Sequence, residues 1–132
     1  IKPDNSPEFA EEVKQQIVNF NAQHWDASLR QPLGLKITAN GELLAGLSGR
    51  TFGNWLMLDY LWVADSCRGM GYGKSLMHEA EHIARSRGCR FVMLDTLDFQ
   101  ARPFYQQLGY QLVFVQEDYP VCGKRYYLQK LL

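Results

Sequence analysis

The chain has 132 residues, of which 46% are hydrophobic and 21% are charged, and its 14 Lys and Arg residues balance 14 Asp and Glu residues. The length suits one domain, and the composition excludes a disordered or fibrous chain. A balanced charge gives no overall attraction to nucleic acid or anionic membranes, and the apolar runs are far shorter than the ~18 residues that a membrane span requires. We therefore expect one globular domain over residues 1–132, with neither nucleic acid nor a membrane as partner.

The three cysteines, Cys67, Cys89 and Cys122, are odd in number and too far apart for a CxxC pair or a zinc knuckle. The first residues lack the charged, apolar and small-residue pattern of a secretory signal. These features predict reduced thiols in a cytoplasmic protein.

The first predicted element is an amphipathic helix. Ser6 is a suitable N-cap before Pro7, and apolar residues then recur at helical spacing through about residue 22. These apolar residues are Phe9, Val13, Ile17 and Phe20.

Three antiparallel strands are expected next. Asn40-Gly41 favours the positive φ angles of a two-residue hairpin turn, and Gly53-Asn54 is a second turn signal. The predicted strands cover residues 34–39, 42–52 and 55–63. The last of them is apolar enough to be buried on both faces.

In the second half, helical spacing from about residue 71 ends at Gly88, a suitable C′ residue. A buried strand at 90–95 follows, and a right-handed crossover would place it parallel to strand 55–63. The remaining elements are a short helix at 98–108 and strands at 110–115 and 124–131. The prediction is an α+β fold with a mixed, mostly antiparallel central sheet flanked by helices.

The last predicted strand, residues 124–131, is rich in aromatic and apolar side chains. We expect it at the edge of the sheet, where it could pair with a second copy to form a homodimer.

A glycine-rich segment, Arg68-Gly69-Met70-Gly71-Tyr72-Gly73, joins strand 55–63 to the following helix. Bare backbone N–H groups at a helix start form a cradle for an anion, and Arg68 and Lys74 could add positive charge. The alternative is a turn that serves only helix packing. Asp95 would suit the ribose of a dinucleotide, but the GxGxG spacing and the preceding antiparallel strands do not fit that fold. A nucleotide-hydrolase loop, GxxxxGK[ST], needs a different glycine spacing.

Two blocks of sequence resemble the GNAT superfamily of N-acetyltransferases. The first runs from Leu61-Trp62-Val63 through the glycine-rich segment to Leu76 and Glu79 on the helix. Its Arg68, Gly71 and Gly73 match the family's [RQ]-x-x-G-x-[GA] loop. The second block is Asp98-x-x-Ala101-x-x-Phe104-Tyr105-x-x-x-Gly109-Tyr110. The family's usual strand before the first helix is not among the elements predicted for this sequence.

The resemblance implies that the chain binds acetyl-CoA as cosubstrate and needs no metal. The backbone of Leu61 and Val63, with Trp62 between them, would hold the acetyl group and pantetheine arm. The loop from Arg68 to Lys74, which includes Gly69, Met70, Gly71, Tyr72 and Gly73, would bind the pyrophosphate. Asp98 stands where the family usually has an Asn that contacts the coenzyme.

The resemblance also assigns catalytic positions. Tyr105 occupies the position of the general acid, and its alternative role is that of a packed core tyrosine. The Glu that serves as base in histone-type members is replaced here by Met57. Asp59, two residues further along the same strand, is the nearest substitute base, and a purely structural carboxylate is the alternative.

The acceptor is expected to be a small amine or an amino-terminal group, which Glu117 and Asp118 could attract. The second functional hypothesis is a catalytically degenerate module that binds acyl-CoA without turnover.

The helix also carries His78-Glu79-Ala80-Glu81-His82, which matches the HExxH pattern of zinc hydrolases. Its apolar stripe lies on the face opposite both histidines, so both should face solvent. This stripe consists of Leu76, Met77, Ala80, Ile83 and Ala84. We therefore disfavour a zinc site and expect no metal.

Overall fold

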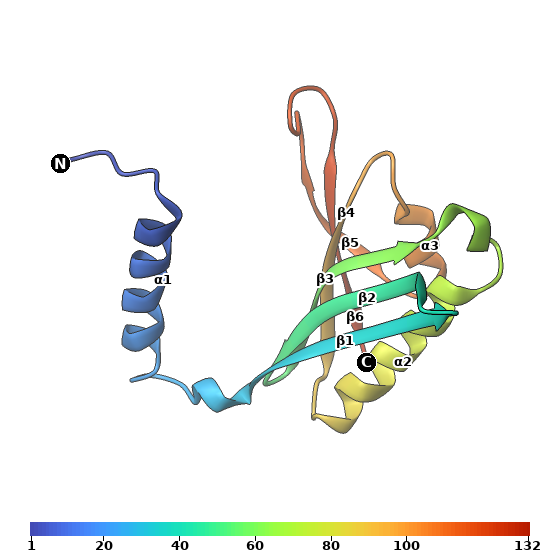
Figure 1. Ribbon diagram of the computed structural model, residues 1–132, viewed down its shortest axis with the longest axis horizontal. Coiled ribbons are helices and arrows are strands. Elements are labelled where there is room, and N and C mark those ends of the chain that lie inside the picture. Colours follow the sequence, from blue (N-terminus) through green and yellow to red (C-terminus); the bar gives the residue numbers. More distant parts are fainter.

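A six-stranded mixed sheet forms the centre of the computed structural model, which describes residues 1–132 (Figure 1). The strand order is β1-β2-β3-β4-β6-β5, and every neighbouring pair is antiparallel except β3 and β4. The strands are β1 (Arg30–Ala39), β2 (Glu42–Phe52), β3 (Trp55–Val63), β4 (Phe91–Leu97), β5 (Gln111–Gln116) and β6 (Arg125–Leu131). The α-helices are α1 (Pro7–Asn21), α2 (Tyr72–Ser86) and α3 (Arg102–Gln107), with 3₁₀ turns at Ala27–Leu29 and Asp65–Cys67. The predicted fold class is confirmed.

The turn residues fix the first three strands as expected. Asn40 and Gly41 have φ angles of 52° and 77°, so a two-residue turn joins β1 to β2. Strand β1 begins four residues before its predicted start and includes Pro32. A proline is tolerated there because β1 is the outer strand of the sheet and its missing N–H breaks no interior ladder.

Strands β3 and β4 separate after a short parallel pairing. Their ladder covers only Trp55 to Met57 on β3 and Phe91 to Met93 on β4. Just beyond it, Asp59 is an extra residue opposite the β2 segment Ser48-Gly49, which makes a β-bulge. A Cβ on Gly49 would stand 2.5 Å from the Met57 carbonyl oxygen, so glycine is needed for this close approach. The bulge bends β3 and opens the sheet between β3 and β4.

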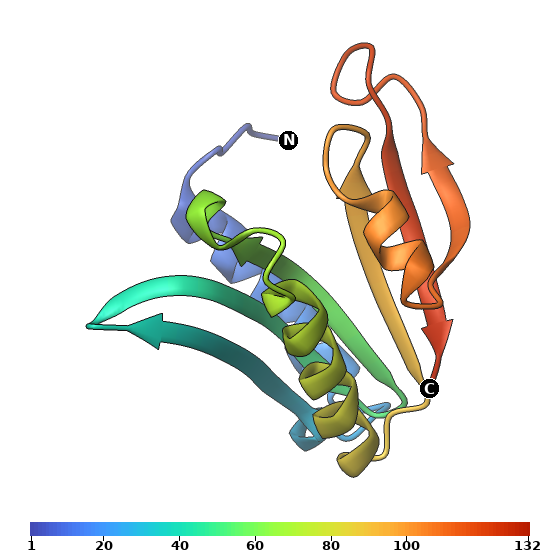
Figure 2. The same ribbon diagram turned by 90° about the vertical axis from the view of Figure 1, so that its right-hand side faces the viewer.

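The hydrophobic core lies between the sheet and the two helices α2 and α3, which cover the same face (Figure 2). Leu56 of β3, Met77 of α2, Val92 of β4 and Leu128 of β6 are fully buried within it. Burying side chains of this size stabilises the fold by roughly 1.5–3 kcal/mol each.

Two expectations about the second half are wrong. Helix α3 begins at Arg102 rather than at 98, because the Gln100 side chain accepts a hydrogen bond from the Leu97 N–H at 2.7 Å and holds a turn. Strand β6 lies between β4 and β5, so the last strand is not at the sheet edge. The edge on that side is β5.

Helix α1 stands apart from the rest of the molecule. Ser6 caps it as predicted, because its Oγ accepts a hydrogen bond from the Phe9 N–H at 3.2 Å. None of its 15 residues is buried, and in Figure 1 it lies beside the sheet, connected only through the segment before β1. None of the α-helices combines the length and the hydrophobicity of a transmembrane segment.

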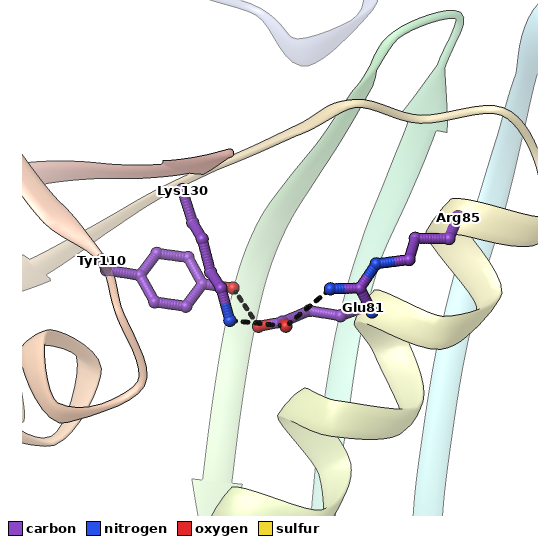
Figure 3. A network of polar contacts seen from close by, with 4 residues as sticks. All are labelled: Glu81, Arg85, Tyr110 and Lys130. Carbon is purple, nitrogen blue, oxygen red and sulfur yellow. Dashed lines mark hydrogen bonds and ion pairs between the residues drawn. The ribbon is translucent and has the colours of Figure 1, made fainter. Parts of the chain in front are cut away.

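A buried carboxylate connects α2 to the far half of the sheet (Figure 3). Glu81 is only 2% exposed, and its two oxygens accept hydrogen bonds from Tyr110 Oη and Lys130 Nζ, each at 2.8 Å. Arg85, one turn further along α2, adds a weaker ion pair at 3.9 Å. The buried charge is thus fully partnered, as a charge in a core must be.

Candidate functional site

The separation of β3 and β4 creates a cleft of about 930 Å³. Its walls come from the ends of both strands, from the start of α2 and from α3. Of the residues that line it, 13 of 23 are hydrophobic, so one part suits an apolar chain and the rest offers polar groups. Because the strands are not paired here, backbone N–H and C=O groups on their facing sides are free to bind a ligand.

The glycine loop forms the end of this cleft at the N-terminus of α2. Gly69 and Gly71 have φ angles of 80° and 81°, a conformation that glycine adopts without strain. Gly71 is the N-cap of α2 and has no side-chain acceptor to occupy the first N–H groups of the helix. These donors and the positive end of a 15-residue helix therefore remain available to an anion.

The glycine loop also carries two positively charged side chains, and one of its glycines makes a close packing contact. Arg68 pairs with Asp65 at 3.1 Å but stays 69% exposed at its side chain, and Lys74 lies in the first turn of α2. Gly73 packs on the ring of Phe104, where an added Cβ would approach Cζ to 3.3 Å. The glycine is therefore needed for the packing of α2 on α3 as well as for access to backbone.

Tyr105 of α3 lines the cleft although it is only 6% exposed. Its ring packs edge-on against Phe104 and Tyr110, with centroids 5.1 and 5.9 Å away. Burial, and secondarily the negative charge of Asp95, raises the pKa of Tyr105 to about 12. The phenol is therefore protonated at neutral pH and can act as a proton donor.

Two carboxylates stand on the two strands that border the opening. Asp59 of β3 pairs with Arg50 at 2.6 Å, and Asp95 of β4 pairs with Arg125 at 2.8 Å. Both aspartates line the cleft. The hydrogen bond to Asp95 raises the pKa of Arg125, so that guanidinium stays charged. The opening thus presents two negative groups, each held in position by an arginine.

The structure brings most of the predicted site residues together. Those lining the cleft are Asp59, Leu61, Trp62, Val63, Arg68, Gly69, Gly71, Tyr72, Gly73, Lys74 and Tyr105. Met70 and Asp98 lie outside the lining. Met70 is 61% exposed, and Asp98 accepts a hydrogen bond from the Lys124 N–H at 3.3 Å, which fastens the end of β4 to the segment before β6.

Sequence reasoning did not assign Asp95 and Arg125 to this site. A signal was available for Asp95, since β4 alternates buried and less buried residues and its only acidic residue falls on the less buried set. The partner Arg125 required knowledge that β6 lies beside β4. Glu117 and Asp118, expected to attract the acceptor, do not line the cleft, and Glu117 instead pairs with Lys124 at 3.7 Å.

The HExxH segment lies on the outer side of α2. His78 and His82 are exposed, as the apolar stripe predicts, and Glu79 is exposed with them. The glutamate that is buried is Glu81, which the helical spacing did not place in the core. No group of three or more His, Cys, Asp or Glu side chains is arranged to hold a metal ion.

Comparison with known proteins gives consistent relatives. A family model described as the acetyltransferase (GNAT) family matches residues 3–110. Blasticidin-S acetyltransferase of Streptomyces morookaense is 46% identical over 81 residues, which cover 61% of this chain and 60% of that protein. An acetyltransferase of Agrobacterium fabrum is 29% identical over 99 residues, covering 74% of this chain and 72% of that protein. The chain thus spans about three fifths of the first relative's length and almost three quarters of the second's.

Solved structures match over a longer stretch. The structure of an acetyltransferase from Bacillus cereus has a TM-score of 0.88 and 30% identity, and the match covers 100% of this chain and 97% of that chain. An aminoglycoside 6'-N-acetyltransferase complexed with coenzyme A has a TM-score of 0.67 at 18% identity, covering 98% and 94%, and shares the fold.

Proposed function

Since this chain belongs to the GNAT acetyltransferase family, we propose that it transfers the acetyl group of acetyl-CoA to a primary amine, by direct attack within a ternary complex. The observation that carries the proposal is the cleft between β3 and β4, which has free helix N–H groups at one end and a buried phenol in its wall.

The residues of the cleft fit acetyl-CoA. The pyrophosphate would bind the N–H groups from Gly69 to Lys74, because the loop has little side-chain bulk and adds the charge of Arg68. The pantetheine arm would lie along the unpaired backbone of Leu61 and Val63, where β4 no longer pairs with β3. Trp62 and Tyr72 add apolar wall area. The placement of Met70 and Asp98 outside the lining gives them no direct contact in this proposal.

The chemistry needs one proton taken up and one delivered. The neutral amine nitrogen attacks the thioester carbon and forms the C–N bond, a backbone N–H stabilises the developing oxyanion, and the C–S bond then breaks. Tyr105 gives its proton to the departing sulfur. Asp59, directly or through water, takes the proton that the amine nitrogen loses, while Arg50 holds the Asp59 carboxylate in position. Tyr105 recovers its proton from solvent after the products leave.

The acceptor side supports a small cationic amine. Asp59 and Asp95 line the opening, and each carboxylate has acceptor capacity beyond its arginine partner that could receive a hydrogen bond from an ammonium group before it loses its proton. A relative that is 46% identical over its matched part is named for blasticidin S. That compound is therefore a suitable first acceptor to test, beside other small amines and an amino-terminal peptide. The three free cysteines support the cytoplasm as the place of this reaction.

A catalytically degenerate acyl-CoA-binding module is the second candidate. It is favoured by Met57, where some family members carry a catalytic glutamate, and by the ion pair that engages Asp59. Thiol release from acetyl-CoA across the amine panel separates the two functions, with coenzyme binding followed by calorimetry. Thiol release that depends on an amine supports the transferase. Tight coenzyme binding with no release for any amine would establish the binding module instead.

A further inference from the structure

The isolated position of α1 leaves a stripe of apolar side chains without a partner. Phe9, Val13, Ile17 and Phe20 lie on one face of the helix, and each is between 42% and 56% exposed. A helix of 15 residues is marginal by itself in water, because most helical stability in proteins comes from packing an apolar face. These four side chains, the α1 stripe, therefore need a second apolar surface to pack against if the helix is to be stable.

The segment that connects α1 to the sheet is itself ordered. Backbone N–H groups of His24 and Trp25 donate to the Asn21 carbonyl at 2.9 and 3.1 Å, and Asp26 caps the turn at Ala27–Leu29. The Trp25 ring packs on Phe52 with centroids 4.9 Å apart. These contacts hold α1 away from its own sheet rather than allowing it to swing freely.

The sheet has an uncovered apolar surface on the side where α1 stands. Helices α2 and α3 cover one face, whereas α1 lies behind the other at a distance (Figure 2). Strand residues that alternate with the core point to this open face, and they are Trp55, Met57, Phe91, Met93, Phe114 and Tyr127. Met93, Phe114 and Tyr127 also line a shallow hollow of about 370 Å³ in it.

One molecule thus carries an uncovered apolar helix and an uncovered apolar sheet face that its connector keeps apart. We infer that α1 of one copy packs its stripe on the open face of a second copy, and that the exchange is reciprocal in a twofold dimer. Two copies arranged in this way cover both surfaces at once and leave neither unpaired. This interface replaces the pairing of the last strand, because β6 is not at the sheet edge.

Area and charge agree with this occupant. The four stripe side chains, two of them aromatic and all about half exposed, leave on the order of 400 Å² of apolar surface per helix. Each docked helix covers a similar area of sheet face, so two reciprocal contacts bury roughly 1,600 Å² in total, the size of a stable interface. A lipid surface fits less well, since α1 carries Glu8, Glu11 and Glu12 against the single cation Lys14.

The displaced helix is a shared feature. Residues 1–29 make up more than a fifth of the chain, and the Bacillus cereus acetyltransferase structure matches the whole chain with a TM-score of 0.88. That score requires α1 to stand in a similar place in that structure.

The test measures the mass of the protein in solution by light scattering coupled to gel filtration at micromolar concentration. We expect a dimer for the wild type. Ile17→Asp places a charge in the stripe and should give a monomer without touching the core, because Ile17 is not buried. Gln15→Asp adds the same side chain on the opposite side of α1 and should remain a dimer.

Mixing two variants tests the exchange itself. Phe114→Asp places a charge on the open face and should prevent α1 from docking there. The fold should tolerate this substitution, because Phe114 is 59% exposed. In a dimer of either variant alone, both docking contacts contain a substituted residue, on α1 in one variant and on the open face in the other. A mixture of Ile17→Asp with Phe114→Asp has one heterodimer in which an intact α1 meets an intact open face, so the mixture should associate where neither variant does. A monomeric wild type, a dimeric Ile17→Asp variant, or a mixture that stays monomeric would each overturn the inference.

Discussion

At the scale of single residues, Tyr105 and Tyr110 are neighbouring buried tyrosines whose hydroxyl groups have different environments. Both rings are buried and lie edge-on to each other. Tyr110 donates a hydrogen bond to Glu81 and belongs to the structural network, whereas Tyr105 lines the cleft. In the sequence, only the resemblance to a family singles out Tyr105 as a candidate acid, because its helical spacing alone is that of a core residue.

Replacing the Tyr105 hydroxyl tests its proposed role as proton donor. Tyr105→Phe keeps the packed ring, so acetyl-CoA affinity should stay within about twofold, while turnover should fall by about 10²-fold or more, a typical loss when a general acid is removed. Since the pKa of Tyr105 is raised to about 12, wild-type turnover should show no loss from this group near pH 10. Steady-state kinetics of thiol release measure both.

A matched control is Tyr126→Phe, since Tyr126 lies on β6 outside the cleft lining and should keep wild-type turnover. If Tyr105→Phe turns over at the rate of this control, Tyr105 is a packing residue.

The buried carboxylate of Glu81 gives a prediction about stability. Glu81→Gln retains an acceptor for Tyr110 but leaves Lys130 without its ion pair, so the free energy of unfolding should fall by about 2–4 kcal/mol. The same substitution at Glu79, exposed two residues earlier on α2, should change it by less than about 0.5 kcal/mol. Urea denaturation followed by circular dichroism compares them. Equal midpoints for the two variants would show that the network adds nothing to stability.

At the scale of elements, helix α2 contributes both to the cleft and to the hydrophobic core. Its N-terminus opens into the cleft without a capping side chain, and its inward face carries the core residues and Glu81. The last turn ends at Gly88, which has a φ angle of 88°. Positive φ therefore occurs at both ends of α2, but only the N-terminal end lines the cleft.

Because a glycine with positive φ lies at each end of α2, a substitution at one end can serve as the control for the same substitution at the other. This comparison tests the anion cradle formed by the glycine loop. Gly71→Val strains the left-handed backbone and adds bulk beside the first N–H groups, so acetyl-CoA affinity should fall at least about tenfold, or 1.4 kcal/mol. Gly88→Val introduces comparable strain at the other end and should leave that affinity unchanged. Calorimetric titration of both folded variants decides the point, and equal affinities would contradict the assignment of the loop.

Local signals were sufficient for most element boundaries. Asn40-Gly41 fixed a hairpin through its positive φ angles, and Ser6-Pro7 marked the start of α1. Arrangements that depend on distant partners escaped prediction. The turn before α3 depends on the Gln100 side chain, the place of β6 depends on pairing with two other strands, and the burial of Glu81 depends on Lys130, 49 residues away.

At the scale of the whole molecule, the sheet consists of two three-stranded parts, β1–β3 and β4–β6, joined through the short β3–β4 ladder. The Glu81 network adds a second link, because it joins α2, which packs on the first part, to Tyr110 and Lys130 beside the second. Stability of the complete fold therefore depends on this connection.

The burial of Tyr105 and Tyr110 predicts how the free energy of unfolding changes with pH. Burial raises the pKa of Tyr110, with Glu81 adding to the effect, and raises that of Tyr105 to about 12. The folded chain thus holds these protons more tightly than the unfolded chain, where the pKa is about 10. Their contribution to stability is complete below pH ~10 and is lost as the pH rises through the folded values.

We expect the thermal midpoint to fall steeply above pH ~10, and Tyr110→Phe, although less stable at neutral pH, to show a shallower fall. Scanning calorimetry between neutral and alkaline pH measures both slopes. Parallel slopes for wild type and variant would exclude Tyr110 as a source of the alkaline loss.

The gap between β3 and β4 has a further consequence, for aggregation. A row of unpaired backbone groups on the outside of a sheet is a template on which other chains can add strands. Here two such rows lie inside the sheet, each facing the other across the cleft, with α2 and α3 over one side. A foreign strand would have to enter between two strands already fixed by their own neighbours, whereas a thin, extended small molecule can reach the same groups. The unpaired backbone of the cleft is therefore shielded from the strand addition that seeds fibrils.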